Sequence, residues 1–249
     1  MKKINIHTTS TRTVLPWVAL SIFILGGSII IAMYWQQNVK VKEVIVVGNH
    51  FTPTQEIIDV SQIPIGIHPD SLDLSMIIQR VEALHYVKEA SPFIDALGNF
   101  KITIHERSPI ALLAHGRHEM YVDQFGVKLP ILDEKILNLP LVYGFDSSVS
   151  SDTLSSKEFN EIRNFLVSAL NNQFGWVTIS EVIYDEYEGV IAMSHENGVK
   201  LLFGTDGYDQ KFKNWEVFYS EVIAYKGIQA MQHIDLRFTD QVITREVGP

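Results

Sequence analysis

Two histidines and a glutamate in the middle of the chain are the residues that most resemble metal ligands. His115 and His118 are three residues apart, and Glu119 directly follows the second histidine. A zinc metalloprotease needs its glutamate between two histidines on one helix, so that the carboxylate reaches the metal-bound water. The neighbouring residues have a strand-and-turn pattern instead, and three-residue spacing in a strand sends side chains to opposite faces. We therefore expect no metal site here.

Other polar groups also lack the spacing of a catalytic or cofactor site. Asp185, Glu186 and Glu188 do not alternate as the ligands of a calcium loop do. The segment 204–207 (Gly-Thr-Asp-Gly) has neither the lysine nor the longer glycine spacing of a phosphate-binding loop. The sequence contains no Gly-x-Ser-x-Gly turn and no cysteine. We predict solvated turns at both places, no catalytic residues and no cofactor.

An apolar stretch near the N-terminus has the length of a transmembrane helix. No charged residue lies between Arg12 and Lys40, and about 20 mostly apolar residues cross the hydrocarbon core of a bilayer. We predict a tail over 1–13, a transmembrane helix over 14–35 and a linker over 36–40. The residues before the helix include basic but no acidic side chains, which indicates a cytoplasmic N-terminus and an extracytoplasmic bulk.

A cleaved signal peptide is the alternative interpretation of this stretch. Its apolar region would be shorter, and small residues would mark the cleavage site, where this chain has the bulky Met33-Tyr34-Trp35. We therefore expect the helix to be retained as an anchor.

The region after the predicted anchor is acidic. The whole chain has a net charge of −9 at pH 7, and its first 40 residues contribute +4, which leaves −13 on the remainder. Nucleic acids and anionic lipid surfaces are bound mainly through lysine and arginine. The composition therefore favours a protein partner over nucleic acid or an anionic lipid surface.

The first part of the outer region predicts the order strand, helix, helix, strand, strand. β-Branched residues favour a strand over 41–47. Thr52 and Gln55 have the spacing of a capping box around Pro53, which predicts a short helix that runs through Val60.

Asp73 has the position of a cap for a second helix in this region. Two strands are predicted next, over 86–94 and 100–105, with a hairpin connection between them. The second helix has an apolar stripe that we expect in the core: Leu74, Ile77, Ile78, Val81 and Leu84.

The second part predicts a mainly antiparallel β domain with two helices. Asn197-Gly198 joins apolar runs over 190–194 and 199–203, and both residues tolerate the positive φ of a tight hairpin turn. A helix over 155–170 begins with Ser155 and Glu158 as a capping box. Its inward residues are expected to be Phe159, Ile162, Phe165, Leu166 and Leu170.

The second helix of this part, over 209–226, ends at Gly227. It carries more aromatic surface than one buried stripe requires. Either all of these side chains pack under the sheet, or some of them face a partner: Phe212, Trp215, Phe218, Tyr219 and Val222.

The C-terminal strand is the place where the sequence indicates function. A β meander that ends near the chain terminus leaves its last strand at a sheet edge, where unpaired N–H and C=O groups accept a strand from another protein.

Short segments along most of the chain resemble the FtsQ/DivIB family of bacterial division proteins. The segment 44–49 (Val-Ile-Val-Val-Gly-Asn), the two short helices and 104–109 (Ile-His-Glu-Arg-Ser-Pro) resemble the POTRA domain of that family. Segment 121–127 resembles a later strand and turn of the family, 139–144 its next apolar segment and 234–238 its near-terminal strand. The resemblance implies an α+β fold with a POTRA domain over 41–109 and an FtsQ-type β domain over 110–249.

The resemblance also implies a divisome scaffold in the inner membrane at the septum, without chemistry of its own. FtsQ-like proteins bind FtsB, itself paired with FtsL, through the last strands and the adjacent helix. Arg237 has an alternative role, because it can instead pair with Asp235 or Glu246. The positions in this chain that match are Arg237, Phe238, Asp240, Val242, Ile243 and Thr244, with Trp215 and Tyr219 from the helix.

The POTRA-like part would offer a second surface for other division proteins, at its first strand or second helix. We expect Arg107, at the boundary between the two outer domains, to fix the angle between them by a salt bridge rather than to contact a partner directly. Two other functions remain possible from the sequence: a POTRA protein of a translocation system and a membrane-anchored cell-wall hydrolase.

Overall fold

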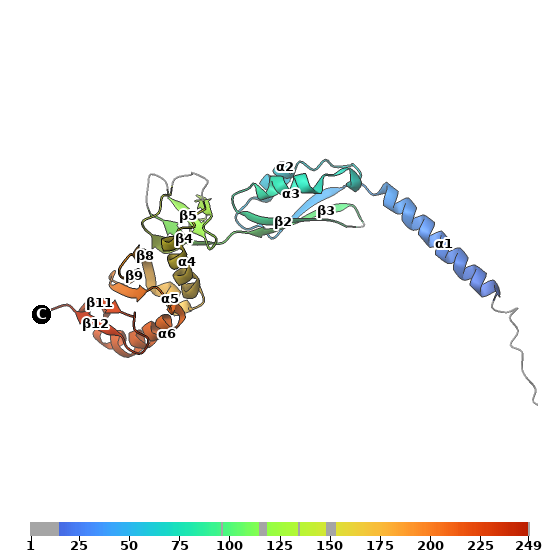
Figure 1. Cartoon of the computed structure of the whole chain (residues 1–249). Coiled ribbons are helices and arrows are strands. Elements are labelled where there is room, and N and C mark those ends of the chain that lie inside the picture. Colours follow the sequence, from blue (N-terminus) through green and yellow to red (C-terminus); the bar gives the residue numbers. More distant parts are fainter. Residues whose placement is uncertain (1–14, 96, 115–118, 134, 148–152, 249) are drawn as a thin grey trace, which may run out of the picture. The chain divides into compact units, whose positions relative to one another are not determined.

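The computed structural model of the chain describes residues 15–95, 97–114, 119–133, 135–147 and 153–248 (Figure 1). His115 and His118, considered above as metal ligands, lie outside these described residues. The chain forms two compact units, which divide between His105 and Glu106. Each unit has its own hydrophobic core.

The first unit contains the long apolar helix that the sequence predicts. α1 spans Leu15–Asn38, and within it Pro16–Tyr34 has a mean hydropathy of 2.1. Among the described residues it is the one helix long and apolar enough to cross a membrane. It continues through 36–38, where the sequence predicts a linker, because glutamine is a good helix former. This helix fits a single-pass membrane protein.

After α1 the elements follow the predicted order of strand, helix, helix, strand, strand. They are β1 (Glu43–Val47), α2 (Thr54–Ser61), η2 (Pro69–Ser71, a 3-10 turn), α3 (Leu74–Glu82), β2 (Val87–Ile94) and β3 (Asn99–Glu106). The sheet order is β1-β3-β2, with β1 parallel to β3. Figure 1 shows α2 and α3 along this sheet, and their inward residues Ile57, Ile77 and Val81 pack on Phe100 and Ile102 of β3.

The starts of the two helices differ in how well the sequence predicts them. Asp73 caps α3 as expected, since its carboxylate accepts the N–H of Met76 at 3.0 Å. The capping box at α2 is wrong: Pro53 holds the cap position with no side-chain bond, and the Gln55 amide donates to Asp59 instead. Leu74, predicted in the core, is 42% exposed, because it occupies the outward side of the first turn of α3.

The second unit is built on one mixed sheet. Within the described residues its strand order is β12-β11-β10-β9-β8-β7-β4-β5-β6. The strands are β4 (Pro109–Leu113), β5 (Met120–Asp123), β6 (Lys128–Pro130), β7 (Leu141–Val142), β8 (Ile179–Asp185), β9 (Gly189–Ser194), β10 (Lys200–Gly204), β11 (Met231–Asp235) and β12 (Ile243–Glu246). The hairpin prediction is confirmed, because Asn197 and Gly198 both have φ of 59°.

The predicted meander is wrong at its end. β10 and β11 run parallel, and so do the pairs β4–β7 and β7–β8. Parallel neighbours need a crossover connection, and helical elements fill the one between β10 and β11. They are α6 (Tyr208–Phe218), η3 (Tyr219–Ile223, a π-helical turn), α7 (Ala224–Lys226) and η4 (Ile228–Ala230).

Two further helices lie between β7 and β8. They are α4 (Lys157–Leu170) and α5 (Gln173–Thr178). Ser156 caps α4 rather than the predicted Ser155, and its hydroxyl accepts the N–H of Phe159. Leu170, predicted to face inward, is 45% exposed at the last turn, whereas the other inward residues of α4 are buried. The helices of this unit and the sheet together enclose the core.

Candidate functional site

The last strand, β12, lies at an edge of the sheet. β11 pairs with it antiparallel on one side, with Ile243 opposite Asp235 and Thr244 opposite Ile234. In the described part of the chain no strand lies on its other side. The edge position that the sequence predicts for this strand is therefore confirmed.

The direction of each backbone amide of β12 follows from the hydrogen bonds around it. Val247 donates its N–H to the Ala230 carbonyl at 2.9 Å, so this amide points toward β11. Alternate residues of a strand direct their backbone groups to opposite sides. The backbone N–H and C=O groups of Ile243 and Arg245 therefore face β11, and those of Thr244 and Glu246 face outward. The outward groups are a template for an added strand.

A groove of about 530 Å³ lies beside this edge, between α6, η3 and the loop that leads into β12. The amide of Asn214 donates to the Thr239 carbonyl at 2.8 Å, which ties that loop to α6. Val217 on the groove wall is 53% exposed. We call it the edge groove, and it is lined by Gln210, Asn214, Val217, Phe218, Glu221, Val222, Thr239, Asp240, Gln241 and Val242.

The predicted contact residues at this edge mostly lie at the surface. Phe238 and Ile243 are each 43% exposed. Asp240 and Val242 line the edge groove, and Val242 also packs against the core. Thr244 is half-buried in the middle of β12. These residues form a continuous segment, although whether a partner contacts them remains a prediction.

Arg237 forms the internal ion pair that the sequence offers as an alternative. Its Nη2 and Nε lie 2.6 and 2.9 Å from the two carboxylate oxygens of Asp235. Burial favours the protonated form of Asp235, but the hydrogen bonds from Arg237 outweigh this and hold the pKa of that carboxyl below its ordinary value. The pair fixes the chain where it leaves β11.

An Arg237→Gln variant is expected to raise the pKa of Asp235. In the parent, the lowered pKa stabilises the fold above the pKa of the unfolded carboxyl, about 3.9, and this contribution disappears as pH falls through the folded pKa. Without the guanidinium, burial still raises the pKa of Asp235, so this carboxyl contributes less to the stability of the fold. Carboxyl chemical shifts measured against pH test this. Asp95 is the control, because its pKa is lowered mainly by the backbone N–H of Asn99 and should stay unchanged. An unchanged Asp235 pKa would contradict this assignment.

The two aromatic residues predicted as partner contacts from the helix have other roles. Trp215 has no exposed surface, and its Nε1 donates to the Thr178 hydroxyl at 2.9 Å. It is a core residue, so the prediction of a direct partner contact is wrong. Tyr219 is half-buried beside Trp215, and its hydroxyl donates to Glu196 at 2.9 Å, which raises the pKa of Tyr219.

The residues of α6 and η3 that do reach the edge groove are Gln210, Asn214, Val217, Phe218, Glu221 and Val222. Their three- and four-residue spacing marks one helix face. Of this face, the sequence singles out only Phe218 and Val222, and the position of the loop before β12 shows that it borders the edge.

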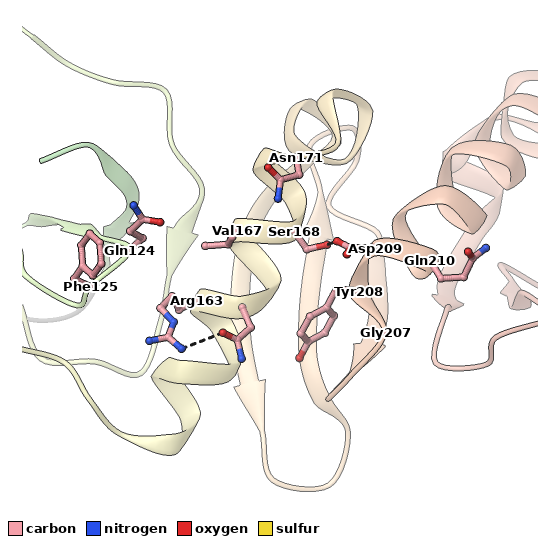
Figure 2. Close-up of a pocket in the computed structure, with 11 residues that line it drawn as sticks. Gln124, Phe125, Arg163, Val167, Ser168, Asn171, Gly207, Tyr208, Asp209 and Gln210 are labelled. Atoms are coloured by element: carbon pink, nitrogen blue, oxygen red, sulfur yellow. Dashed lines mark hydrogen bonds between the residues drawn. The ribbon is translucent and has the colours of Figure 1, made fainter.

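A second cavity, the helix groove, has a volume of about 700 Å³ and lies between α4, the start of α6 and the turn after β5. Figure 2 shows the residues that line it. The Ser168 hydroxyl donates to Asp209, which ties α4 to α6. Arg163 Nη2 donates to Asn164 at 3.1 Å. The lining residues include no histidine: Gln124, Phe125, Arg163, Asn164, Val167, Ser168, Asn171, Gly207, Tyr208, Asp209 and Gln210. Their hydrogen bonds indicate a structural role.

The remaining polar clusters form turns. The Asp185 carboxylate accepts the N–H groups of Tyr187 and Glu188, as in a solvated turn. Segment 204–207 leads into α6, where the buried Lys211 donates to the Phe203 and Asp206 carbonyls. No group of three or more histidine, aspartate or glutamate residues suited to a metal occurs in the described ranges.

Arg107 forms a salt bridge, as the sequence predicts, but both partners belong to the second unit, so a role in the interdomain angle stays a prediction. Its Nη1 lies 3.0 Å from the buried carboxylate of Asp123, within the second unit. The other carboxylate oxygen accepts the N–H groups of Phe125 and Val127. Arg107 therefore stabilises the β5–β6 turn.

Two family models match this chain. A family model described as FtsQ/DivIB, C-terminal related, matches residues 108–245. The chain belongs to the FtsQ/DivIB family. A second model, described as POTRA domain, FtsQ-type, matches residues 39–107, which contain the βααββ elements. Membership in the FtsQ/DivIB family implies other division proteins as partners.

Individual relatives agree with this membership. Proteins named cell division protein FtsQ from Salinibacter ruber and Geobacter sp. (strain M21) are 23% and 26% identical to this chain. The alignments cover 85% and 78% of this chain and 84% and 71% of the relatives.

This chain is also similar to a solved structure, the major extracytoplasmic domain of the trans isomer of the bacterial cell division protein DivIB from Geobacillus stearothermophilus. It is 15% identical, with a TM-score of 0.33 over 49% of this chain and 98% of that structure.

Proposed function

We propose that this chain is a divisome scaffold that binds an FtsB/FtsL-like complex by adding a partner strand to β12. The observation that carries the proposal is the edge strand with outward amides at Thr244 and Glu246, next to the edge groove. Main-chain hydrogen bonds supply affinity in strand addition, and side-chain pockets supply specificity.

The groove and the strand form one binding surface. Val242 and Thr244 share a face of the extended chain because side chains alternate along a strand. Both are half-buried, and Val242 is also part of the groove wall. A partner strand beside β12 would direct every second side chain toward that face. An apolar residue there would contact Val217 and Phe218.

The scaffold role includes a membrane location and a second docking surface. α1 would cross the inner membrane once, with the N-terminus in the cytoplasm and both domains outside, at the septum. The POTRA domain would bind other division proteins through β1 or α3, since β1 is an edge strand. The chain would link early and late division proteins without catalysis.

Binding of the outer region, residues 41–249, to a peptide from the same organism's FtsB tests the proposal. Thr244→Pro removes one outward N–H and leaves the amides that face β11 in place. We expect this variant to bind at least about tenfold more weakly, because a hydrogen bond between backbone groups is lost and the added strand is displaced.

Thr244→Ala is the matched control, since it removes the side chain and keeps the amide. It should bind within about twofold of the parent, and both variants should unfold near the parent temperature. Equal binding by the proline variant would refute strand addition at this position. No binding by the parent would instead place the partner elsewhere, including on the POTRA domain.

A further inference from the structure

The chain that leaves α1 is fixed between two loops of the POTRA domain. Val41 donates its N–H to the Ile67 carbonyl at 2.9 Å and accepts the N–H of Gly66 at 2.7 Å. On the other side, Lys42 donates to the Gly98 carbonyl at 2.9 Å. We call this surface the tether face and define it as residues 40–42, 63–67, 95, 97 and 98.

The packing at the tether face is tight. A Cβ atom added at Gly98 would lie 2.2 Å from the Lys40 carbonyl oxygen, so the hairpin turn closes directly on the incoming chain. Figure 1 shows the turn between β2 and β3 at the end of the domain where this chain enters. The loops therefore keep a fixed position relative to Lys40.

Two large aliphatic side chains project from these loops into solvent. Ile65 is 58% exposed and Leu97 is 59% exposed. One lies on the loop after α2 and the other in the hairpin turn, so each flanks the tether from a different side. Each of these side chains would bury apolar surface if the loops contacted a membrane or another protein.

The length of the tether decides between these two partners. The apolar window of α1 ends at Tyr34, and the helix itself ends at Asn38. Four helical residues rise about 6 Å, and three extended residues add at most about 10 Å. Val41 is therefore within about 16 Å of the end of the apolar window, and the lipid headgroups occupy about 5–7 Å of that distance.

We propose that the tether face docks on the surface of the membrane that α1 spans, with Ile65 and Leu97 inserted among the lipid headgroups. The proposal rests on α1 crossing the membrane and does not depend on how the chain binds its division partners. The Lys40 and Lys42 ammonium groups would contact lipid phosphates. Asp95 and Glu43 offset these positive charges, so apolar insertion supplies the attraction.

Docking would set the orientation of the POTRA domain. β1 begins at the tether face and runs away from it, so its far end and the C-terminal end of α3 would point away from the lipid. The domain would then stand upright on the membrane.

Site-directed spin labelling of the full chain in lipid nanodiscs tests the proposal. The chain has no cysteine, so one introduced cysteine carries the only label. Pro64→Cys places it on an exposed position beside Ile65, and His85→Cys places it before β2, on an exposed position at the other end of the domain. β2 alone separates these ends by about 26 Å.

The measured quantity is the ratio of collisions with oxygen, which concentrates in lipid, to collisions with a water-soluble nickel complex. We expect the ratio to be several-fold higher at position 64 than at position 85. Adding Ile65→Ser and Leu97→Ser to the Pro64→Cys protein should lower its ratio to the value at position 85. The far-ultraviolet circular dichroism spectrum shows whether that variant remains folded.

Three results would overturn the proposal. The first is an equal ratio at positions 64 and 85 in the parent background. The second is a high ratio at 64 that survives both serine substitutions, which would mean that the tether alone holds the loop near lipid. The third is a label at 64 that neither reagent reaches, which would indicate protein contact.

Discussion

Replacing Trp215 with alanine is expected to lower the free energy of unfolding of the outer region by about 3–5 kcal/mol, the cost of truncating a large buried aromatic side chain. Trp215 has no exposed surface, and it contacts the rings of Phe174 and Tyr219 at centroid distances of 6.1 and 5.3 Å. The substitution also removes its hydrogen bond to Thr178. Chemical denaturation of residues 41–249, followed by circular dichroism, measures this change.

Val217→Ala is the control on the same helix. Val217 is 53% exposed and lines the edge groove, so its truncation should change stability by less than about 0.5 kcal/mol. It should also weaken partner binding, whereas Trp215→Ala should affect binding only through the unfolded fraction. A loss below about 1 kcal/mol for Trp215→Ala would contradict its assignment to the core.

Replacing Gly48 with alanine is expected to destabilise the POTRA domain by about 2–5 kcal/mol. This is the sum of two costs, one for a left-handed backbone at a residue with a side chain and one for a steric overlap. Gly48 has φ of 88°, and an added Cβ would lie 2.3 Å from the Ile104 carbonyl oxygen. That oxygen belongs to the central strand β3, so it cannot move without breaking the sheet.

Gly66→Ala separates the two contributions to this effect. Gly66 also has φ of 88°, but an added Cβ would meet no atom within 4 Å. It should therefore cost only the conformational part, about 1–2 kcal/mol. Thermal unfolding of both variants compares them, and equal losses would show that the overlap at Gly48 is relieved.

The order of elements in the POTRA domain is predictable from sequence because each element carries its own signal. Asp73 at the start of α3 and the β-branched residues of β1 are local patterns. The start of α2 is less predictable, since Thr52 has the right spacing for a cap but is buried, and Asn49 donates to its carbonyl instead. Ser155 and Ser156 are adjacent, and sequence alone does not choose between them.

The architecture of the second unit depends on contacts that no local pattern reveals. β7 consists of Leu141–Val142 alone, yet it joins β4 to β8 and makes the sheet continuous. The parallel pairing of β10 and β11 follows from the helices between them. Tyr219 follows the buried Trp215 by one helical turn and contacts its ring, so it donates to Glu196 and does not line the edge groove.

The candidate site is predictable from the sequence only in part. The sequence predicts the edge position of β12 from a meander, and β12 does lie at a sheet edge, although β10 and β11 pair in parallel instead. The burial of Trp215 depends on α5, since Thr178 at the end of that helix accepts the indole N–H. The sequence pattern does not predict α5.

The measurement that tests strand addition most directly is amide hydrogen exchange of residues 41–249, with and without a saturating FtsB peptide. Exchange at Thr244 and Glu246 is expected to slow by at least about tenfold in the complex, because the partner strand would pair with these outward amides. Ile243 and Arg245, which already face β11, should change much less. Unchanged exchange at Thr244 and Glu246 in a chain that binds the peptide would contradict the account.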